Sequence, residues 1–295
     1  MMIKRLISFT GLLLPLLSFA QQEITITETS KDFSGGNKNS YVLTIPEASL
    51  KDVNNDWQKM IKKDAKGKIE DNKSEVKASL VTLKAVSGVP LMIYSRTMEA
   101  KEGIQLSVWL MEGDSFISTG YSADKSTAVQ KYLHDFGVQE YKAVAKKQLE
   151  DQQDKQKQLE KIYDGFVKDQ KKADKEVTDA QKEIEKLKQK NIDEEGNIKQ
   201  AKANKEANIS TASSQKDIDA EKKHTKELEG YIKDQEKAEN NIKSNNKRIE
   251  RLQDKIKDET ANSAKAKDNQ GPASSNVDAQ KTQVAAAQDK LNNIK

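Results

Sequence analysis

The feature that most constrains the fold is a proline-free stretch from residue 91 to residue 271, rich in lysine, glutamate, glutamine and alanine. Proline interrupts helices whereas these four residue types favour them, so the stretch permits very long helices. Side chains along it form rows whose steps alternate between four and three residues. This 3.5-residue period predicts a left-handed coiled coil.

Two rows carry the coiled-coil prediction. The first consists of Leu159, Tyr163, Phe166, Gln170, Ala173, Val177, Ala180, Ile184, Leu187 and Asn191. The second consists of Ile218, Glu221, Thr225, Leu228, Ile232, Gln235, Glu239, Ile242, Asn246, Ile249, Gln253 and Ile256. Because several positions are polar, each helix alone would be marginally stable. The alternative is a single solvated helix held by charge pairs four residues apart.

An internal repeat supports a helical unit that occurs more than once. The segment 163–173 matches 228–238, and a weaker copy begins at Glu194. A run of serine, threonine and alanine at 210–214 predicts a break at which the helix folds back. We therefore expect residues 146–268 to form an antiparallel hairpin that sets the first repeat against the last.

The register of that hairpin stays open at this stage. Val177 is expected opposite either Ile242 or Ile249, two registers that differ by one heptad. A parallel homodimer would bury the same rows and ranks second. Gly271-Pro272 predicts a firm stop, so residues 269–275 are expected to form a linker and residues 276–295 a short C-terminal helix.

The globular core is expected in the first half of the chain. Residues 21–145 hold ten aromatic residues and residues 146–295 hold three, and aromatics supply large buried areas. Apolar patterns in 21–145 predict strands near 24–26, 41–45, 76–83, 91–98, 104–111 and 116–117, and helices near 50–61 and 129–144. Ser49 is a candidate N-cap for the first helix. The order β-β-α-β-β-β-β-α favours an α+β domain, an antiparallel sheet with helices on one face.

The first twenty residues are typical of a secretory signal peptide. Lys4 and Arg5 precede the apolar run 6–17, and Ser18-Phe19-Ala20 predicts cleavage between Ala20 and Gln21. The mature protein is therefore expected to be exported, in a periplasm or outside the cell. No later segment is apolar enough for a membrane span. The chain has no cysteine, which excludes a disulfide and a lipid anchor attached through cysteine.

Composition and motifs offer little support for catalysis. The 51 Lys and Arg nearly balance the 47 Asp and Glu, so general binding to nucleic acid is not expected. The two histidines, His134 and His224, lie far apart, and no phosphate loop or nucleophile motif is present. Residues 191–198 resemble the start of a calcium loop, but Lys202 occupies the position of the essential acid. We therefore predict no catalytic residue, no cofactor and no metal.

Two tryptophans are the candidate binding residues. Trp57 and Trp109 lie within the predicted globular domain, where a core position is the economical interpretation. The alternative is that one of them lines a groove for a ligand or partner.

Several segments together resemble a family of uncharacterised exported proteins of Bacteroidetes-type bacteria. They are Ser18-Phe19-Ala20-Gln21-Gln22, Gly35-Gly36-Asn37 before the strand 41–45, the Trp57–Lys63 helix, and Ser107-Val108-Trp109-Leu110-Met111 with Phe116-Ile117-Ser118. The resemblance covers most of the chain and implies an N-terminal α+β domain with a coiled-coil tail. Some members bear a DNA repair ATPase label, but this sequence lacks the phosphate loop that such an activity needs.

These observations favour an exported, non-catalytic envelope protein. Its α+β head would bind an envelope protein, and its coiled coil would serve for spacing or self-association. One alternative is a coiled-coil regulator of a cell-wall hydrolase. The other is an enzyme with an unrecognised site in the head, with hydrolase-like activity as the expected chemistry.

Overall fold

A computed structural model describes residues 23–72, 75–212 and 218–295, which form two compact units. We call the unit formed by residues up to 156 together with 280–295 the head, and the unit formed by residues 157–279 the stalk. The predicted signal peptide and its cleavage site lie outside the described residues. No helix among the described residues is long and apolar enough to cross a membrane.

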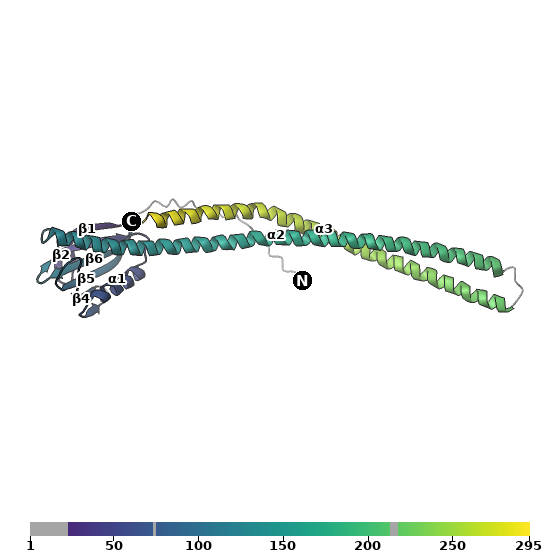
Figure 1. Cartoon of the computed structure of the whole chain (residues 1–295), viewed down its shortest axis with the longest axis horizontal. Coiled ribbons are helices and arrows are strands. Elements are labelled where there is room, and N and C mark those ends of the chain that lie inside the picture. The colour runs from purple at the N-terminus through teal and green to yellow at the C-terminus, as the bar shows by residue number, and fades with distance from the viewer. Residues whose placement is uncertain (1–22, 73–74, 213–217) are drawn as a thin grey trace. The chain divides into compact units, whose positions relative to one another are not determined.

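The head contains a seven-stranded antiparallel sheet in the order β1-β2-β6-β5-β4-β3, with β7 paired to β6 (Figure 1). The strands are β1 (Thr25–Phe33), β2 (Gly36–Ile45), β3 (Ile69–Asp71), β4 (Val76–Val81), β5 (Leu91–Ala100), β6 (Gly103–Glu112) and β7 (Ser115–Phe116). The predicted α+β class is confirmed. The order differs only by β3, which is too short and too polar to show an apolar pattern.

Two helices pack on one face of this sheet. Helix α1 (Leu50–Asp64) begins at the predicted cap, because Ser49 accepts a hydrogen bond from the Asp52 amide at 3.1 Å. Its apolar stripe is buried against alternate residues of β2, β5 and β6 and against the first turns of α2 (Ala123–Ala212). This face holds the main core of the head, and we call it the inner face.

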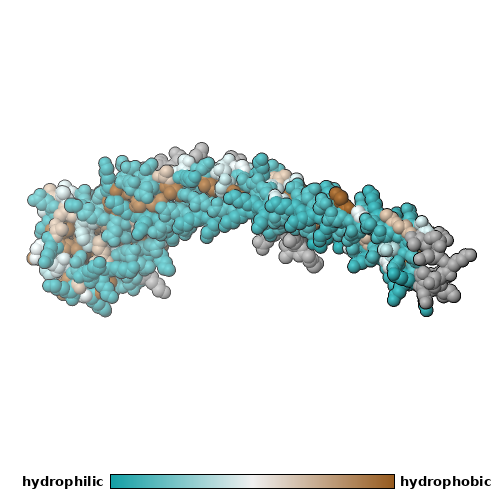
Figure 2. Space-filling model, turned by 45° about the vertical axis from the view of Figure 1, so that its right-hand side comes forward, coloured by the Kyte–Doolittle hydropathy of each residue, from teal (hydrophilic) through white to brown (hydrophobic). Residues whose placement is uncertain are grey.

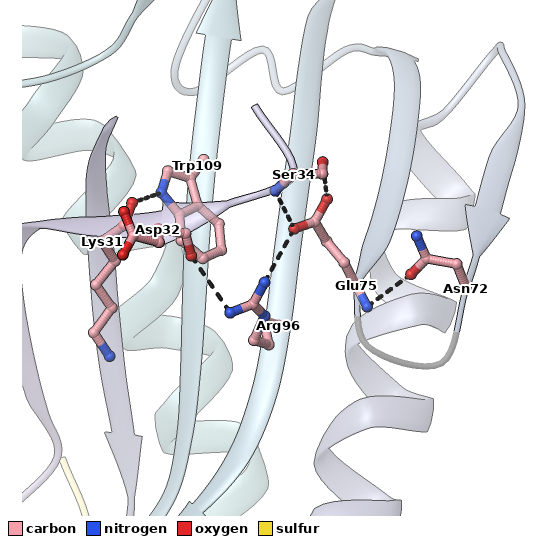
Figure 3. A network of polar contacts seen from close by, with 7 residues as sticks. All are labelled: Lys31, Asp32, Ser34, Asn72, Glu75, Arg96 and Trp109. Atoms are coloured by element: carbon pink, nitrogen blue, oxygen red, sulfur yellow. Dashed lines mark hydrogen bonds and ion pairs between the residues drawn. The ribbon is translucent and has the colours of Figure 1, made fainter. Parts of the chain in front are cut away.

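The outer face is partly covered by the β1–β2 hairpin, which curls across it. The Trp109 indole Nε1 on β6 donates to the Lys31 carbonyl oxygen at 3.3 Å, and an Arg96 guanidinium nitrogen on β5 donates to the Asp32 carbonyl oxygen at 3.4 Å (Figure 3). Phe33 then packs against Trp109, Tyr94 and Phe116, with ring centroids 4.8–5.6 Å apart. A second, smaller aromatic core therefore lies beneath the hairpin.

The stalk is an antiparallel pairing of α2 with α3 (Ile218–Asn293), which lie side by side in Figure 1. Residues 210–212 of the predicted turn at 210–214 still belong to α2, which ends at Ala212, and the last two residues of that turn lie outside the described part of the chain. The hairpin is built within one chain, as predicted. Figure 2 shows that most of the face in view is hydrophilic, which agrees with charged residues interleaved along the helices.

The burial pattern confirms the first heptad row and corrects half of the second. In α2 the buried positions include Ala173, Ala180, Ile184 and Leu187, all from the predicted row. In α3 five members of the predicted row face inward as expected: Leu228, Gln235, Ile242, Ile249 and Ile256. The members that alternate with them are exposed: Ile232, Glu239, Asn246 and Gln253. Their preceding neighbours are the inward-facing ones: Tyr231, Ala238, Asn245 and Leu252. Both rows have a 3.5-residue spacing, so period alone does not separate them.

The hairpin register also differs from both predicted registers. Glu176 pairs with Lys255 at 3.2 Å, so the neighbouring Val177 does not lie opposite Ile242 or Ile249. Asn191 bonds to Asn245 at 2.9 Å, which is the same register further along. The two strong repeats therefore do not face each other. The first repeat instead packs against a non-repeated part of α3, and the last repeat lies level with the weaker copy that begins at Glu194.

The predicted linker at 269–275 is wrong, because α3 continues through Pro272. Proline lacks an amide donor and crowds the carbonyl four residues before it, which normally breaks a helix. Here the flanking residues hold the helix against α2. Ala273 and Val277 are buried, and the Gln270 side-chain amide donates to Gln170 at 2.7 Å. The predicted helix at 276–295 is thus the end of α3, and its last part belongs to the head.

Candidate functional site

The two tryptophans occupy opposite faces of the head sheet. Trp57 lies in the inner core, where its indole Nε1 donates to Ser95 Oγ at 2.9 Å and its ring contacts Phe136 edge-on. Trp109 lies beneath the curled hairpin on the outer face. Each is only 1% exposed. The two residues do not come together, and both act in packing.

Polar contacts fasten the hairpin to the start of β4, beside the outer aromatic core. Glu75 is buried and accepts hydrogen bonds from the Ser34 amide at 3.1 Å and from the Ser34 hydroxyl (Figure 3). Arg96 approaches the same carboxylate at 3.5 Å. The Arg96 Nε is buried without a hydrogen-bond partner among the described residues. This cluster therefore closes β1 onto β4 while leaving one arginine donor unused.

Strand β5 runs past the end of its neighbour β4 at this point. The pairing of β4 with β5 begins at Val76 opposite Ser95, whereas β5 remains paired with β6 up to Ala100. Within the described residues, 96–100 consequently have backbone partners on β6 only. The other edge of this segment, which we call the open β5 edge, has no backbone partner among the described residues.

A cavity of about 470 Å³ lies along the open β5 edge, between it and the start of α1. Its lining combines backbone edge, amides and charges of both signs: Ser49, Leu50, Lys51, Asn54, Asn55, Asp71, Glu75, Val76, Ser95, Arg96, Thr97 and Glu99. A strand edge beside a helix can receive an extended chain, because the edge offers main-chain hydrogen bonds and the cavity offers room for a side chain. We call this arrangement the β5 groove.

Other carboxylates of the head join elements together. Glu112 accepts hydrogen bonds from Lys125, Ser87 and, at 2.9 Å, from the Tyr121 hydroxyl. The bond from Lys125 contributes most to lowering the pKa of Glu112 to about 2. An ionised carboxylate with these three hydrogen bonds holds β6 to the start of α2. Because it stays ionised, it is a poor proton donor or acceptor at neutral pH.

Glu28 has the same function on β1. Burial alone would raise its pKa, but hydrogen bonds from the Thr119 side chain and amide and from Ser126 lower it further than burial raises it. Ser126 in turn accepts a bond from the Tyr41 hydroxyl at 2.9 Å. The network links β1, β2 and the first turn of α2. Among the described residues, no group of three or more His, Asp or Glu side chains is placed to hold a metal ion.

Comparison with protein-family models, curated proteins and solved structures found no match to this chain. The resemblance to an exported Bacteroidetes-type family therefore stays a prediction. The β5 groove was not visible to sequence reasoning, because it depends on where β4 stops relative to β5. The only sequence signal was the polar stretch 71–75, which interrupts the apolar pattern just before β4.

Proposed function

We propose that the chain is an exported, non-catalytic envelope protein whose head binds a partner and whose coiled coil acts as a spacer. The observation that carries this proposal is the β5 groove. A strand edge without backbone partners exposes hydrogen-bonding groups that most proteins cover, and within the described part of the chain this edge borders a cavity.

The partner that fits is an extended segment of an envelope protein, added as a strand next to residues 96–100. Main-chain hydrogen bonds would supply affinity whatever the sequence, and the cavity would select one side chain. The lining carries three carboxylates, from Asp71, Glu75 and Glu99, and two cations, from Lys51 and Arg96. The net charge is negative, so a lysine or arginine in the partner segment is favoured.

The stalk supports the spacing role. Its seam carries buried alanines and cross-helix hydrogen bonds between side chains, and α3 satisfies the inward face of α2 within one chain. Such a hairpin holds its shape without a second copy, as a spacer requires. Self-association of the stalk surface is the alternative route to a partner.

The test compares two charge reversals on the full mature chain, using sedimentation with envelope fractions. Glu99→Arg places a cation in the β5 groove, and we expect binding to fall about tenfold. Glu102→Arg makes the same charge change three residues away, in the exposed β5–β6 turn and outside the groove, and should bind as the unaltered chain does. Equal binding by the two variants would refute the groove as the binding site.

A further inference from the structure

The two helices of the stalk carry their helix-breaking residues at the same level. The Ser263 hydroxyl donates to the Asp174 carboxylate, which fixes the register at that point. Nine residues back along α2 is Gly165, and nine residues forward along α3 is Pro272. The Gln270–Gln170 bond at 2.7 Å, which joins two long side chains, agrees with this register to within three residues. Gly165 therefore lies level with Gly271-Pro272.

Packing does not explain these residues. A Cβ atom built on Gly165 or on Gly271 would meet no atom within 4 Å, so neither glycine is needed for a close helix approach. Pro272 is exposed and removes one hydrogen bond from the α3 ladder. Glycine and proline are the two residues least favourable in a helix interior. Both helices are thus locally less stable at this level, although the surrounding space would accommodate residues that favour a helix.

The shared level matters because, in a helical hairpin, a weak point in one helix is normally supported by an intact helix packed opposite it. A glycine in one helix opens little when the facing helix is strong and packed against it. Two other stalk glycines show this ordinary situation. Gly196 and Gly230 also have open space around them. The Asn191–Asn245 bond places Gly196 opposite Asn240, and the Asn208–Glu227 bond places Gly230 opposite Lys205. Neither of those facing segments contains a breaker.

We infer that Gly165 and Gly271-Pro272 form one composite hinge, at which both helices of the stalk open together. This inference goes beyond the binding role and depends on the stalk alone. The hinge would let the spacer bend at a defined level while the heptad seam beyond it stays closed. Bending there requires no loss of the Asn191–Asn245 contact or of the buried Ile184 and Leu187.

Hydrogen exchange of backbone amides in the full mature chain tests the hinge. Amides near 161–169 and 268–276 should exchange at least tenfold faster, after correction for intrinsic rates, than those around Gly196 and Gly230. Gly165→Ala should slow exchange about fivefold in α2 and also in the unaltered segment 268–276 of α3. Pro272→Ala should slow exchange in both helices in the same way.

Gly196→Ala and Gly230→Ala are matched controls, because each makes the same replacement in the same helices without a facing breaker. Their effect should stay within about one turn of the altered residue. The inference is overturned if exchange at the Gly165 level is no faster than at the control levels. It is also overturned if Gly165→Ala protects only α2, because the two helices would then open independently.

Discussion

At the scale of single residues, Glu140 is the side chain least suited to its surroundings. It lies on α2, is only 5% exposed, and faces Asp52 and Asp56 of α1. Burial, then repulsion from these two aspartates, raises the pKa of Glu140 to about 7, although Lys59 opposes the shift. The folded protein therefore holds a proton near neutral pH that the unfolded chain releases.

This shift sets the direction of a pH dependence. The ordinary pKa of Glu140 is 4.5, so its contribution to stability is complete below that value and is lost as pH rises toward the folded value of about 7. The loss amounts to at most about 3 kcal/mol. Glu140→Gln removes the charge, and we expect it to raise the free energy of unfolding above pH 7 and to change it little at pH 4.5.

Urea unfolding at pH 4.5, 6 and 8 measures this effect. Glu150→Gln, at an exposed position of the same helix, is the control and should leave the pH dependence unchanged. If Glu140→Gln is no more stable than the unaltered chain at pH 8, then Glu140 does not carry a buried charge there. Glu112 acts in the opposite direction, since its lowered pKa gives stability that is lost only as pH falls toward about 2.

At the scale of elements, the sequence predicts whether a segment is a helix or a strand better than it predicts how neighbouring elements are aligned. Helices, the antiparallel sheet and the first heptad row follow from the periodicity and composition of the chain. The residues of α3 that face α2 do not follow from the sequence in the same way. Ala238 and Glu239 fit a 3.5-residue spacing equally well, and only packing against α2 decides which of them faces inward. Pro272 misleads for a related reason: burial of Ala273 and Val277 outweighs the local cost of proline.

The β5 groove escapes prediction on the same grounds. Its edge exists because β4 begins opposite Ser95 and not further along β5, and strand register depends on contacts distant in sequence. Glu75 and Arg96 are separated by 21 residues and come together only through that register. The tryptophans stood out in the sequence because of their size, and the structure places both in packed positions.

The polar part of the stalk seam yields a prediction about register. Asn191 accepts a bond from Asn245 at 2.9 Å and donates to Asn246 at 2.8 Å. A polar pair in the seam, here partly buried, fixes alignment at some cost in stability. Asn191→Ala alone should lower the free energy of unfolding of the stalk by about 1 kcal/mol, because Asn245 loses its partner. Asn191→Leu with Asn245→Leu should instead stabilise the stalk.

Helix content during thermal unfolding measures both variants. Asn197→Leu is the control, at an exposed position of α2, and should change stability only slightly. A double variant less stable than the single one would show that the asparagines contribute more than alignment.

At the scale of the whole molecule, the head is discontinuous in sequence. Its core includes Ile294, which is 3% exposed, and Lys290, near the end of α3, also packs into the head. The Lys290 ammonium is buried, lies 2.6 Å from the Glu47 carboxylate and 3.0 Å from the Gln148 side-chain oxygen, and sits over the Tyr141 ring at 5.4 Å. The last residues of the chain thus complete a domain that begins with β1.

This arrangement predicts that the C-terminal segment stabilises the head. Ending the chain at residue 279 removes Ile294 from the core and leaves Glu47 without its cation, so the head should unfold at lower urea concentration. Lys290→Ala isolates the charge. Glu47 is held in the left-handed region, with φ 56°, where a non-glycine residue needs support from its contacts. We expect the substitution to cost about 1 kcal/mol, because the Glu47 side chain is 34% exposed and keeps its hydrogen bond from Gln148 at 2.7 Å.

The chain itself provides a specific probe, since Trp57 and Trp109 are its only tryptophans and both lie in the head. Their fluorescence follows unfolding of the head without a signal from the stalk. Lys290→Met combined with Glu47→Gln should recover part of the loss, since no unpaired charge remains, and Lys295→Ala at the exposed terminus should have little effect. Burial raises the pKa of Glu47, but the hydrogen bonds from Lys290 and Gln148 and the charge of Lys290 together lower it by more. This contribution is therefore present at neutral pH and is lost in acid. An unchanged fluorescence midpoint in the shortened chain would mean that the core closes without α3.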